Sequence, residues 1–323
     1  MKILAVDDDE IILDLLTEIL TSLGYSDLTT ARSAADAYHA ISSADVPYDC
    51  ILLDIQMPVT DGIAFCGAIR GLKDYVETPV VMITAMSDKK YIDNAFQAGA
   101  TDYVTKPFDV TELSTRVRLA ERLSEDQKKR RAAENLLPAT FKRTDEEKAD
   151  LDLPISIRDV DCVIDYVSME NYLAQLSRSA LFGSCVIAFK INDVEQFHDS
   201  MTNYEFACTV TDVAEAITIA LVGRQHLISY AGAGVYTVVL DSLNGLDLPS
   251  INARIKQAMF DLSMCYSDGR PLYLSMTHGA PVRLTLRSGL GAIRALKIAI
   301  GNARLQDYQT TANGNLAQQM HGT

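Results

Sequence analysis

Five side chains in the N-terminal third have the chemistry needed to accept a phosphoryl group. Asp7 and Asp8 follow the first apolar run of the chain, and Asp54 lies at the end of a later one. Thr84 and Lys106 end two further runs. Carboxylate oxygens are the ligands that Mg²⁺ prefers, and a metal ion with an ammonium group can neutralise charge on a transferring phosphoryl group. The set predicts Mg²⁺-dependent phosphoryl transfer to a carboxylate, with Asp54 as the nucleophile.

The elements that must position these residues alternate between strand-like and helix-like patterns. Short apolar runs occur at residues 2–6, 48–55, 79–85 and 101–108, and helical spacing occurs at residues 10–23 and 88–98. Apolar strands separated by amphipathic helices are typical of a parallel sheet that is covered on both faces. In a doubly wound sheet the carboxyl ends of the strands meet at one crevice, so we expect the five side chains to converge there.

Residues 1–122 resemble the receiver domain of bacterial response regulators. The motifs that carry the resemblance are, in order, DDD after the first strand, LLDIQMPVTDG, ITA and KPF. The resemblance implies a doubly wound five-stranded α/β domain that is phosphorylated by a histidine kinase or a phosphotransfer protein. The matching positions are the phosphoacceptor Asp54, the metal ligands Asp7, Asp8, Asp54 and the main-chain carbonyl of Gln56, the phosphoryl-contacting residues Thr84 and Lys106, and the switch aromatic Tyr103. For Tyr103, simple packing at the edge of the core is the alternative.

The remaining chain predicts a linker and a second domain. One long helix is expected over residues 109–137, which Pro138 ends, and a charged segment without periodicity follows. Strands joined by hairpins and helices then favour an α+β domain with a mainly antiparallel sheet. The predicted organisation is a receiver domain at 1–122, a helical and charged linker at 123–154, a second domain at 155–310 and a flexible tail at 311–323.

The second domain resembles a GGDEF domain, the module of diguanylate cyclases. The segments SCVIAFKI, SYAGAGVYTVVL and LSMTHGAPV, and a final helix that ends in AIGNAR, occur in that family's order. The family's metal-binding residues are missing, because Lys190 stands where the first aspartate of an Asp-Ile-Asp motif is expected. The signature hairpin carries no carboxylate either, since its positions are Ala231, Gly232, Ala233, Gly234 and Val235. Mg²⁺ on a triphosphate needs hard oxygen ligands, so the resemblance implies a degenerate domain that is not an enzyme.

Several further positions bear on nucleotide binding. The family's guanine-reading residues align near His198 and Ala207, which differ from its Asn and Asp. The inhibitory Arg-x-x-Asp motif aligns with residues 222–225 and is absent, although Arg224 is close by. The turn AGAG is interpreted as a glycine-rich hairpin turn, with a main-chain phosphate cradle as the alternative. Lys190 could contact a phosphate directly, so a nucleotide or cyclic-di-GMP sensor remains an alternative, and an active cyclase a weaker one.

Composition limits the class of protein. The 323 residues carry a net charge of −14, which argues against a nucleic-acid partner. The six cysteines lack metal spacing and indicate free thiols in a reducing compartment. No signal peptide and no apolar run of membrane-spanning length is recognised, so we expect a cytoplasmic protein with no membrane association. Between Asp268 and Asp307 every charged residue is basic, which fits either a solvated surface or a docking face for an acidic or phosphate-bearing partner.

The sequence therefore predicts a response regulator that is phosphorylated on Asp54 and signals through protein–protein interaction. The cofactor is expected to be Mg²⁺ in the receiver domain, and the downstream partner is not identified. A homodimer is left open, because the apolar stripe of the long helix over residues 109–123 could pack on its own sheet instead.

Overall fold

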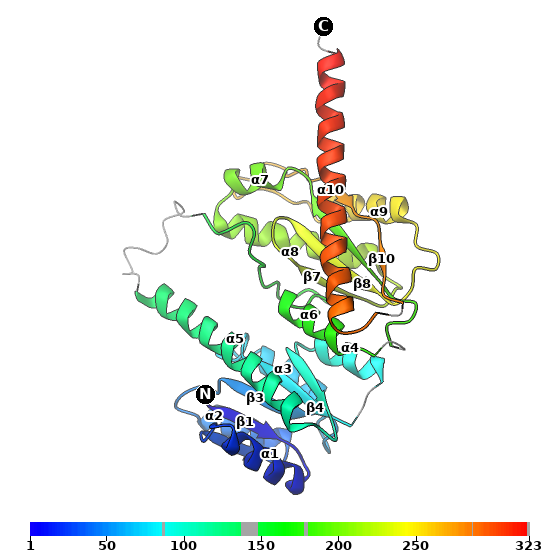
Figure 1. Ribbon diagram of the computed structural model, residues 1–323. Coiled ribbons are helices and arrows are strands. Elements are labelled where there is room, and N and C mark those ends of the chain that lie inside the picture. Colours follow the sequence, from blue (N-terminus) through cyan, green and yellow to red (C-terminus); the bar gives the residue numbers. More distant parts are fainter. Residues whose placement is uncertain (86–87, 137–147, 178–179, 286, 322–323) are drawn as a thin grey trace. The chain divides into compact units, whose positions relative to one another are not determined.

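The computed structural model describes residues 1–85, 88–136, 148–177, 180–285 and 287–321 (Figure 1). The chain divides into two compact units, Met1–Lys142 and Arg143–Thr323, and each is described by itself. Within the described residues, no helix is long and apolar enough to cross a membrane.

The first unit is built on a parallel five-stranded sheet. Its strands are β1 (Ile3–Val6), β2 (Leu28–Ala31), β3 (Cys50–Asp54), β4 (Val80–Thr84) and β5 (Asp102–Thr105). Their order in the sheet is β2-β1-β3-β4-β5, and every neighbouring pair is parallel. The chain runs outward in both directions from β1, which makes the carboxyl ends of β1 and β3 the switch point where such sheets place their ligand sites. The predicted doubly wound α/β fold is confirmed.

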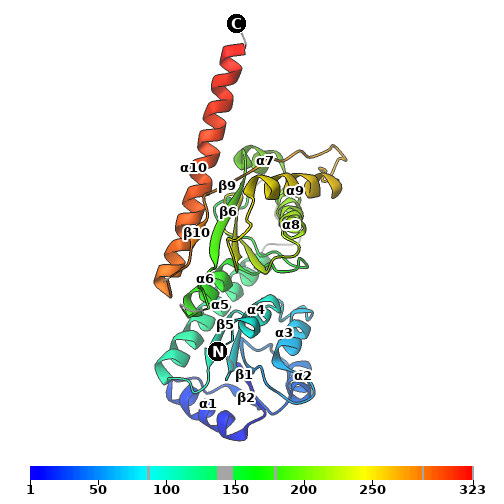
Figure 2. The same cartoon turned by 90° about the vertical axis from the view of Figure 1, so that its right-hand side faces the viewer.

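Helices cover both faces of this sheet. They are α1 (Glu10–Ser22), α2 (Ala34–Ser43), α3 (Gly62–Arg70), α4 (Lys89–Gln97) and α5 (Val110–Leu136). Side chains of α1 and α5 share one core cluster with the strands, whereas α2, α3 and α4 lie on the opposite face (Figure 2). The sequence patterns predicted α1, α4 and α5 to within two residues at each end. They missed β2, whose four residues LTTA include only one buried side chain and give no apolar run.

The second unit is an α+β structure. Its helices are α6 (Tyr166–Gln175), α7 (Val194–Ser200), α8 (Asn203–Ala220), α9 (Leu248–Asp261) and α10 (Leu290–His321). Its strands are β6 (Cys185–Ile191), β7 (His226–Tyr230), β8 (Val235–Leu240), β9 (Met276–His278) and β10 (Val282–Arg283). The sheet has the order β10-β6-β8-β7, with β9 also paired to β6, and all of these pairs are antiparallel. The predicted mainly antiparallel sheet is confirmed.

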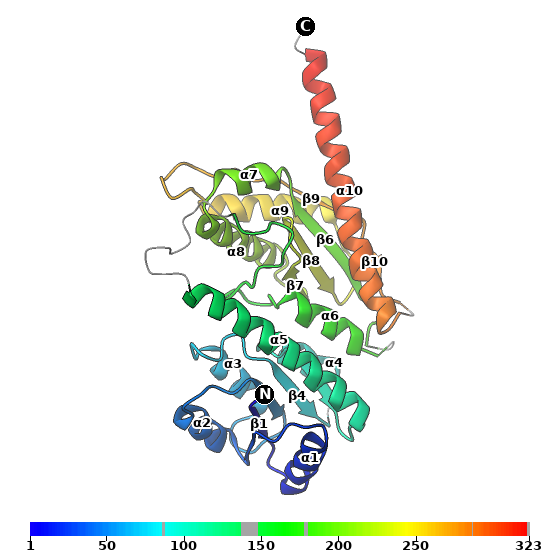
Figure 3. The same cartoon turned by 60° about the vertical axis from the view of Figure 1, so that its left-hand side comes forward.

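Opposite faces of this sheet have different partners. Alternate residues of β6, such as Ile187 and Phe189, enter a core cluster with α8 and α9. The other face receives α10, which lies along β6 and β10 (Figure 3). The residues of α10 that pack there are small or unbranched at Cβ: Ala292, Ala295, Leu296, Ala299 and Ala303. Small side chains let the helix approach the sheet closely.

Three boundaries differ from those predicted. Residues 148–154, assigned to the linker, pack on the second unit, where the carbonyl of Leu151 accepts a hydrogen bond from the amide of Ala233 at 2.6 Å. The segment LSMTHGAPV does not form one strand but is split into β9 and β10 around Gly279. A Cβ at Gly279 would lie 2.5 Å from the amide nitrogen of Ala303, so the break lets α10 pass.

The third difference concerns the predicted tail at 311–323, for which no helix was expected. The backbone is helical to His321, as the end of α10, and residues 322–323 lie outside the described residues. The flexibility of this tail stays a prediction. Extending an existing helix costs much less than nucleating one, so a polar segment can continue a helix that tertiary packing has already formed. The charged segment at 137–147 also lies outside the described residues.

Candidate functional site

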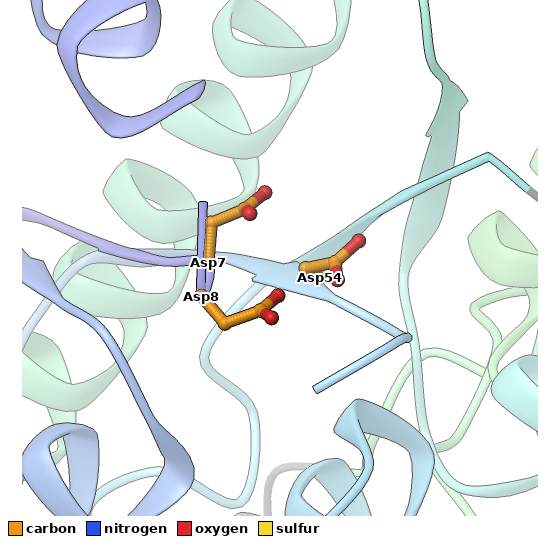
Figure 4. A group of neighbouring side chains, drawn as sticks. All are labelled: Asp7, Asp8 and Asp54. Atoms are coloured by element: carbon orange, nitrogen blue, oxygen red, sulfur yellow. The ribbon is translucent and has the colours of Figure 1, made fainter. Parts of the chain in front are cut away.

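Three carboxylates meet at the carboxyl ends of β1 and β3. Asp7 follows β1, Asp54 ends β3, and the register pairs Val6 with Leu53, which sets the two aspartates side by side. One oxygen from each of Asp7, Asp8 and Asp54 lies within 4.8 Å of the others. Figure 4 shows the three side chains pointing into the same space. Asp7 and Asp54 are buried, at 0% and 3% exposure, whereas Asp8 is exposed. An all-oxygen donor set of this kind suits a hard divalent cation.

Lys106 joins the cluster from β5. Its Nζ donates hydrogen bonds to Asp7 Oδ2 at 2.6 Å and to Asp54 Oδ1 at 2.9 Å. Its amide donates to the carbonyl of Thr84 at 2.7 Å, and Thr84 itself is fully buried at the end of β4. The ends of four strands therefore meet at one place, as the sequence predicted. One ammonium group faces three carboxylates, so the cluster keeps a net negative charge.

The protonation of this cluster follows from its burial. The pKa of Asp54 is raised from 3.8 to about 6, and burial is the largest cause. The hydrogen bond and the charge of Lys106 act to lower this pKa, whereas the charges of Asp7 and Asp8 act to raise it. For Lys106, burial lowers the pKa, but its hydrogen bonds to Asp7 and Asp54 outweigh this and hold the pKa above its usual 10.5. Lys106 is therefore a cation at neutral pH, and a divalent cation would favour the ionised form of Asp54.

The loop after Asp54 is shaped by a close backbone approach. A Cβ on Gly62 would lie 2.0 Å from the carbonyl oxygen of Asp54, so only glycine fits there. The Gly62 amide donates to the carbonyl of Ile55 at 2.9 Å, and Asp61 caps α3 by accepting from the amide of Ala64 at 2.7 Å. These contacts fix where β3 ends. The side chain of Gln56 is exposed in this loop, and metal binding by its carbonyl stays a prediction.

Tyr103 lies on β5 and is packed into the unit. Its side chain is 6% exposed, and its ring meets Phe96 of α4 edge to face, with centroids 6.2 Å apart. Burial is the largest cause of the raised pKa of its hydroxyl. This is the placement expected of a packed aromatic side chain. The switch role for Tyr103 stays a prediction.

In the second unit, the turn between β7 and β8 is closed by contacts within the chain. The amide of Ala233 donates to Leu151, and the amide of Gly234 donates to Tyr230 Oη at 3.0 Å. A Cβ at Gly232 would lie 2.1 Å from the carbonyl oxygen of Asp152. The amide of Ala231 donates to the carbonyl of Val235 at 2.8 Å. Because these amides are already bonded and the turn is covered by residues 151–153, the geometry favours a structural turn over a phosphate cradle.

Lys190 on β6 is neutralised from α10. Its Nζ lies 2.6 Å from Asp307 Oδ2, and the two side chains are 7% and 14% exposed. A lysine held in this way is not positioned to contact a phosphate while the pair is intact. Reasoning from the sequence did not assign a role to Asp307, although it is the only acidic residue after Asp268, and that isolation was the available signal.

The positions aligned with base recognition are also unlike a binding site. His198 is 6% exposed, and its ring packs edge to face on Phe206 at a centroid distance of 4.8 Å. Ala207 has no polar side chain. Arg224 donates to the main-chain carbonyls of Asn244 and Gly245, so it helps to hold a surface loop.

Comparison with known proteins identifies the first unit. Residues 3–118 match the family described as response regulator receiver domain. Over 123 residues the chain is 41% identical to transcriptional regulatory protein KdpE of Staphylococcus aureus, which covers 38% of this chain and 51% of that protein. It is 36% identical over 118 residues to the DNA-binding dual master transcriptional regulator RpaA of Synechocystis, covering 36% of this chain and 47% of that protein.

Among solved structures, the chain resembles chemotaxis protein CheY4 of Vibrio cholerae with 30% identity and a TM-score of 0.35, covering 37% of this chain and 97% of that one. The chain spans about half the length of the curated relatives it matches. All of these matches cover 36–39% of the chain. The family match over residues 3–118 shows that the N-terminal part of this protein is a response regulator receiver domain.

Proposed function

We propose that this protein is a response regulator that accepts a phosphoryl group on Asp54 and signals through protein contacts of its second unit, without converting a nucleotide. The observation that carries the proposal is the cluster of Asp7, Asp8 and Asp54 closed by Lys106. A histidine kinase or a phosphotransfer protein is the proposed donor. The receiver family of the first unit supports this, since it implies phosphorylation-based signalling.

Each residue of the cluster has a proposed part in the transfer. Asp54 supplies the carboxylate oxygen that attacks phosphorus while the bond from phosphorus to the donor breaks. Lys106 neutralises charge on the phosphoryl oxygens, and the Thr84 hydroxyl donates a hydrogen bond to one of them. Asp7, Asp8, Asp54 and the carbonyl of Gln56 would hold Mg²⁺. When bound, this ion neutralises the negative charge that the carboxylates and the phosphoryl group bring together.

The second unit is proposed to be a degenerate GGDEF-like output domain that binds proteins. The contacts of Lys190 with Asp307, and of the turn at 231–234 with residues 151–153, support a fold without a nucleotide site at these positions. The names of the curated relatives describe regulators of transcription, but the match to them covers only 36–38% of this chain. The family match lies in the first unit, at residues 3–118, so the relatives give no support for an output of the second unit.

The test is GTP turnover and nucleotide binding by the full-length protein, with and without a beryllofluoride mimic of the phosphoryl group on Asp54. We expect neither turnover nor saturable binding of GTP or cyclic-di-GMP in either state, with or without Mg²⁺. Turnover that Asp54→Asn abolishes would refute the proposed non-catalytic output. Binding without turnover would replace it with a nucleotide sensor.

A further inference from the structure

The outer face of α10 carries an unusual set of exposed side chains. Successive residues of a helix are 100° apart, so the buried residues of α10 lie on one arc that faces the sheet. The opposite arc, about 120° wide, is here called the outer stripe. Its exposed members are Leu290, Arg294, Lys297, Ile298, Arg304, Leu305 and Tyr308, and the half-buried Gly301 lies among them.

The apolar members of the outer stripe are strongly exposed. Leu290 is 83% exposed, Leu305 65% and Tyr308 76%, and Ile298 is 41% exposed. A single exposed leucine is ordinary on a protein surface, but several aligned on one helix face are typical of a face that packs against another chain. The stripe extends over 19 residues of helix, from Leu290 to Tyr308, or about 27 Å. This length is enough to hold a partner helix of about five turns.

The charged members of the stripe are all basic. No acidic residue occurs between Asp268 and Asp307, and Asp307 lies on the inner side, bound to Lys190. Glu170 of α6 is 3.9 Å from the Nζ of Lys297, whose side chain is 66% exposed. In the part of the chain that the structure describes, no ion pair involves Arg294 or Arg304. In a protein with a net charge of −14, this stripe is a local basic surface.

We propose that the outer stripe binds an acidic amphipathic helix of a partner protein, an inference that rests on the proposed protein-binding output of the second unit. Leucine-like side chains of the partner would cover Leu290, Leu305 and Tyr308, and its carboxylates would pair with the three cations. Arginine suits this role, because its planar group can bind a carboxylate through two hydrogen bonds. Charge complementarity of this kind gives both fast association and selectivity.

The same observations argue against two other occupants. A second copy of this chain, paired through the same stripe about a two-fold axis, would bring the basic side chains of one copy (Arg294, Lys297 and Arg304) against the basic side chains of the other. An anionic lipid surface would attract the cations, but Arg294 projects from the middle of the apolar side chains. Inserting that face into hydrocarbon would bury its guanidinium group at a large cost.

The test uses the full-length protein and a labelled synthetic peptide of 18 residues, with leucines along one helical face and glutamates beside them. A peptide of the same composition in shuffled order is the control ligand, and binding is followed by fluorescence anisotropy. We expect the amphipathic peptide to bind at least about ten-fold more tightly than the shuffled one, and to weaken as NaCl is raised. Equal binding of the two peptides, or none of either, would overturn the proposal.

Substitutions on α10 test whether the peptide binds to the outer stripe. Arg294→Glu/Arg304→Glu is expected to lower the affinity by about ten-fold or more, and Leu305→Ser by several-fold. The matched control Arg254→Glu/Lys256→Glu reverses two exposed charges on α9 and should leave the affinity unchanged. Circular dichroism confirms that each variant is folded. Equal losses in the α10 and α9 variants, or binding only to phosphatidylglycerol vesicles, would contradict the proposed helix partner.

The outcomes separate this inference from the proposed function. GTP turnover together with stripe-dependent peptide binding would refute the non-catalytic output and leave the docking face standing. No turnover together with no peptide binding would remove the docking face and leave the phosphorylation-controlled regulator standing.

Discussion

At the scale of single residues, the receiver site places negatively charged carboxylates where burial makes ionisation unfavourable. Two of its three carboxylates are almost fully buried, and one lysine serves both. This arrangement destabilises the ionised form of Asp54 in the absence of a cation. Binding of a divalent cation, alone or together with a phosphoryl group, should therefore stabilise the site, because the cation offsets the charge of the carboxylates.

Replacing Asp54 with asparagine should stabilise the metal-free protein at neutral pH. Because the folded pKa of about 6 is above the ordinary 3.8, Asp54 stabilises the fold when protonated, and this contribution is lost as pH rises from about 4 to 6. After allowance for solvent screening, Asp54→Asn should raise the free energy of unfolding by about 1–2 kcal/mol at pH 7.5 and by much less at pH 4.

Chemical denaturation at both pH values, without Mg²⁺, measures this difference. Asp14→Asn, at an exposed position on α1, is the matched control and should show no such pH-dependent gain. An Asp54→Asn variant that is less stable than wild type at pH 7.5 would mean that the cluster is not strained by charge.

The ion pair between Lys190 and Asp307 makes a second prediction at this scale. Removing one partner of a buried pair leaves an uncompensated charge, so Asp307→Ala should lower the free energy of unfolding by about 3 kcal/mol. The double variant Lys190→Met/Asp307→Ala should recover most of the loss. Asp268→Ala, which breaks the exposed pair with Arg270, should cost less than about 1 kcal/mol. Additive losses in the double variant would show that the two groups are not coupled.

At the scale of elements, the loop between β3 and α3 combines a required glycine with a strained valine. Gly62 allows the backbone contact with Asp54, whereas Val59 adopts a φ of 72° with its side chain fully exposed. Positive φ is unfavourable for a β-branched residue, and an exposed side chain gains no packing in return. The strain therefore lies five residues from Asp54 in the chain.

Val59→Gly should relieve this strain. We expect the variant to be more stable by about 1 kcal/mol, because glycine adopts a positive φ without strain. Part of the gain is offset, because glycine also makes the unfolded chain more flexible. The measurement is the melting temperature of Val59→Gly. The control is Val46→Gly, at another exposed valine in this unit. A lower melting temperature for Val59→Gly than for wild type would show that the valine is held by contacts that outweigh the strain.

At the scale of the whole molecule, the sequence was most informative where chemistry and periodicity coincide. The apolar runs that end in Asp54 and Thr84 predicted both the strands and the site. A short, continuous apolar run is typical of a parallel strand that is buried on both faces, and the polar residue at its end marks the edge of the sheet. Segment 148–154 could not be placed in the same way. Its charged sequence resembles a linker, and its attachment depends on tertiary contacts with the turn at Ala233. The pairing of Lys190 with Asp307 spans 117 residues, a separation that local patterns do not encode.

The two units carry different features. The first unit holds the acidic cluster and belongs to the receiver family, and the second contributes an antiparallel sheet with a basic and apolar helix face. Output through protein contact is consistent with that face. The proposal is that phosphorylation of Asp54 controls this output.

The most direct test of this account is the intact mass of the full-length protein after incubation with acetyl phosphate and Mg²⁺. We predict that wild-type protein gains the mass of a single phosphoryl group, that Asp54→Asn gains none, and that omission of Mg²⁺ prevents the gain. A wild-type protein that stays unmodified, or an Asp54→Asn variant that is modified to the same extent, would contradict the central claim that Asp54 is the phosphoacceptor.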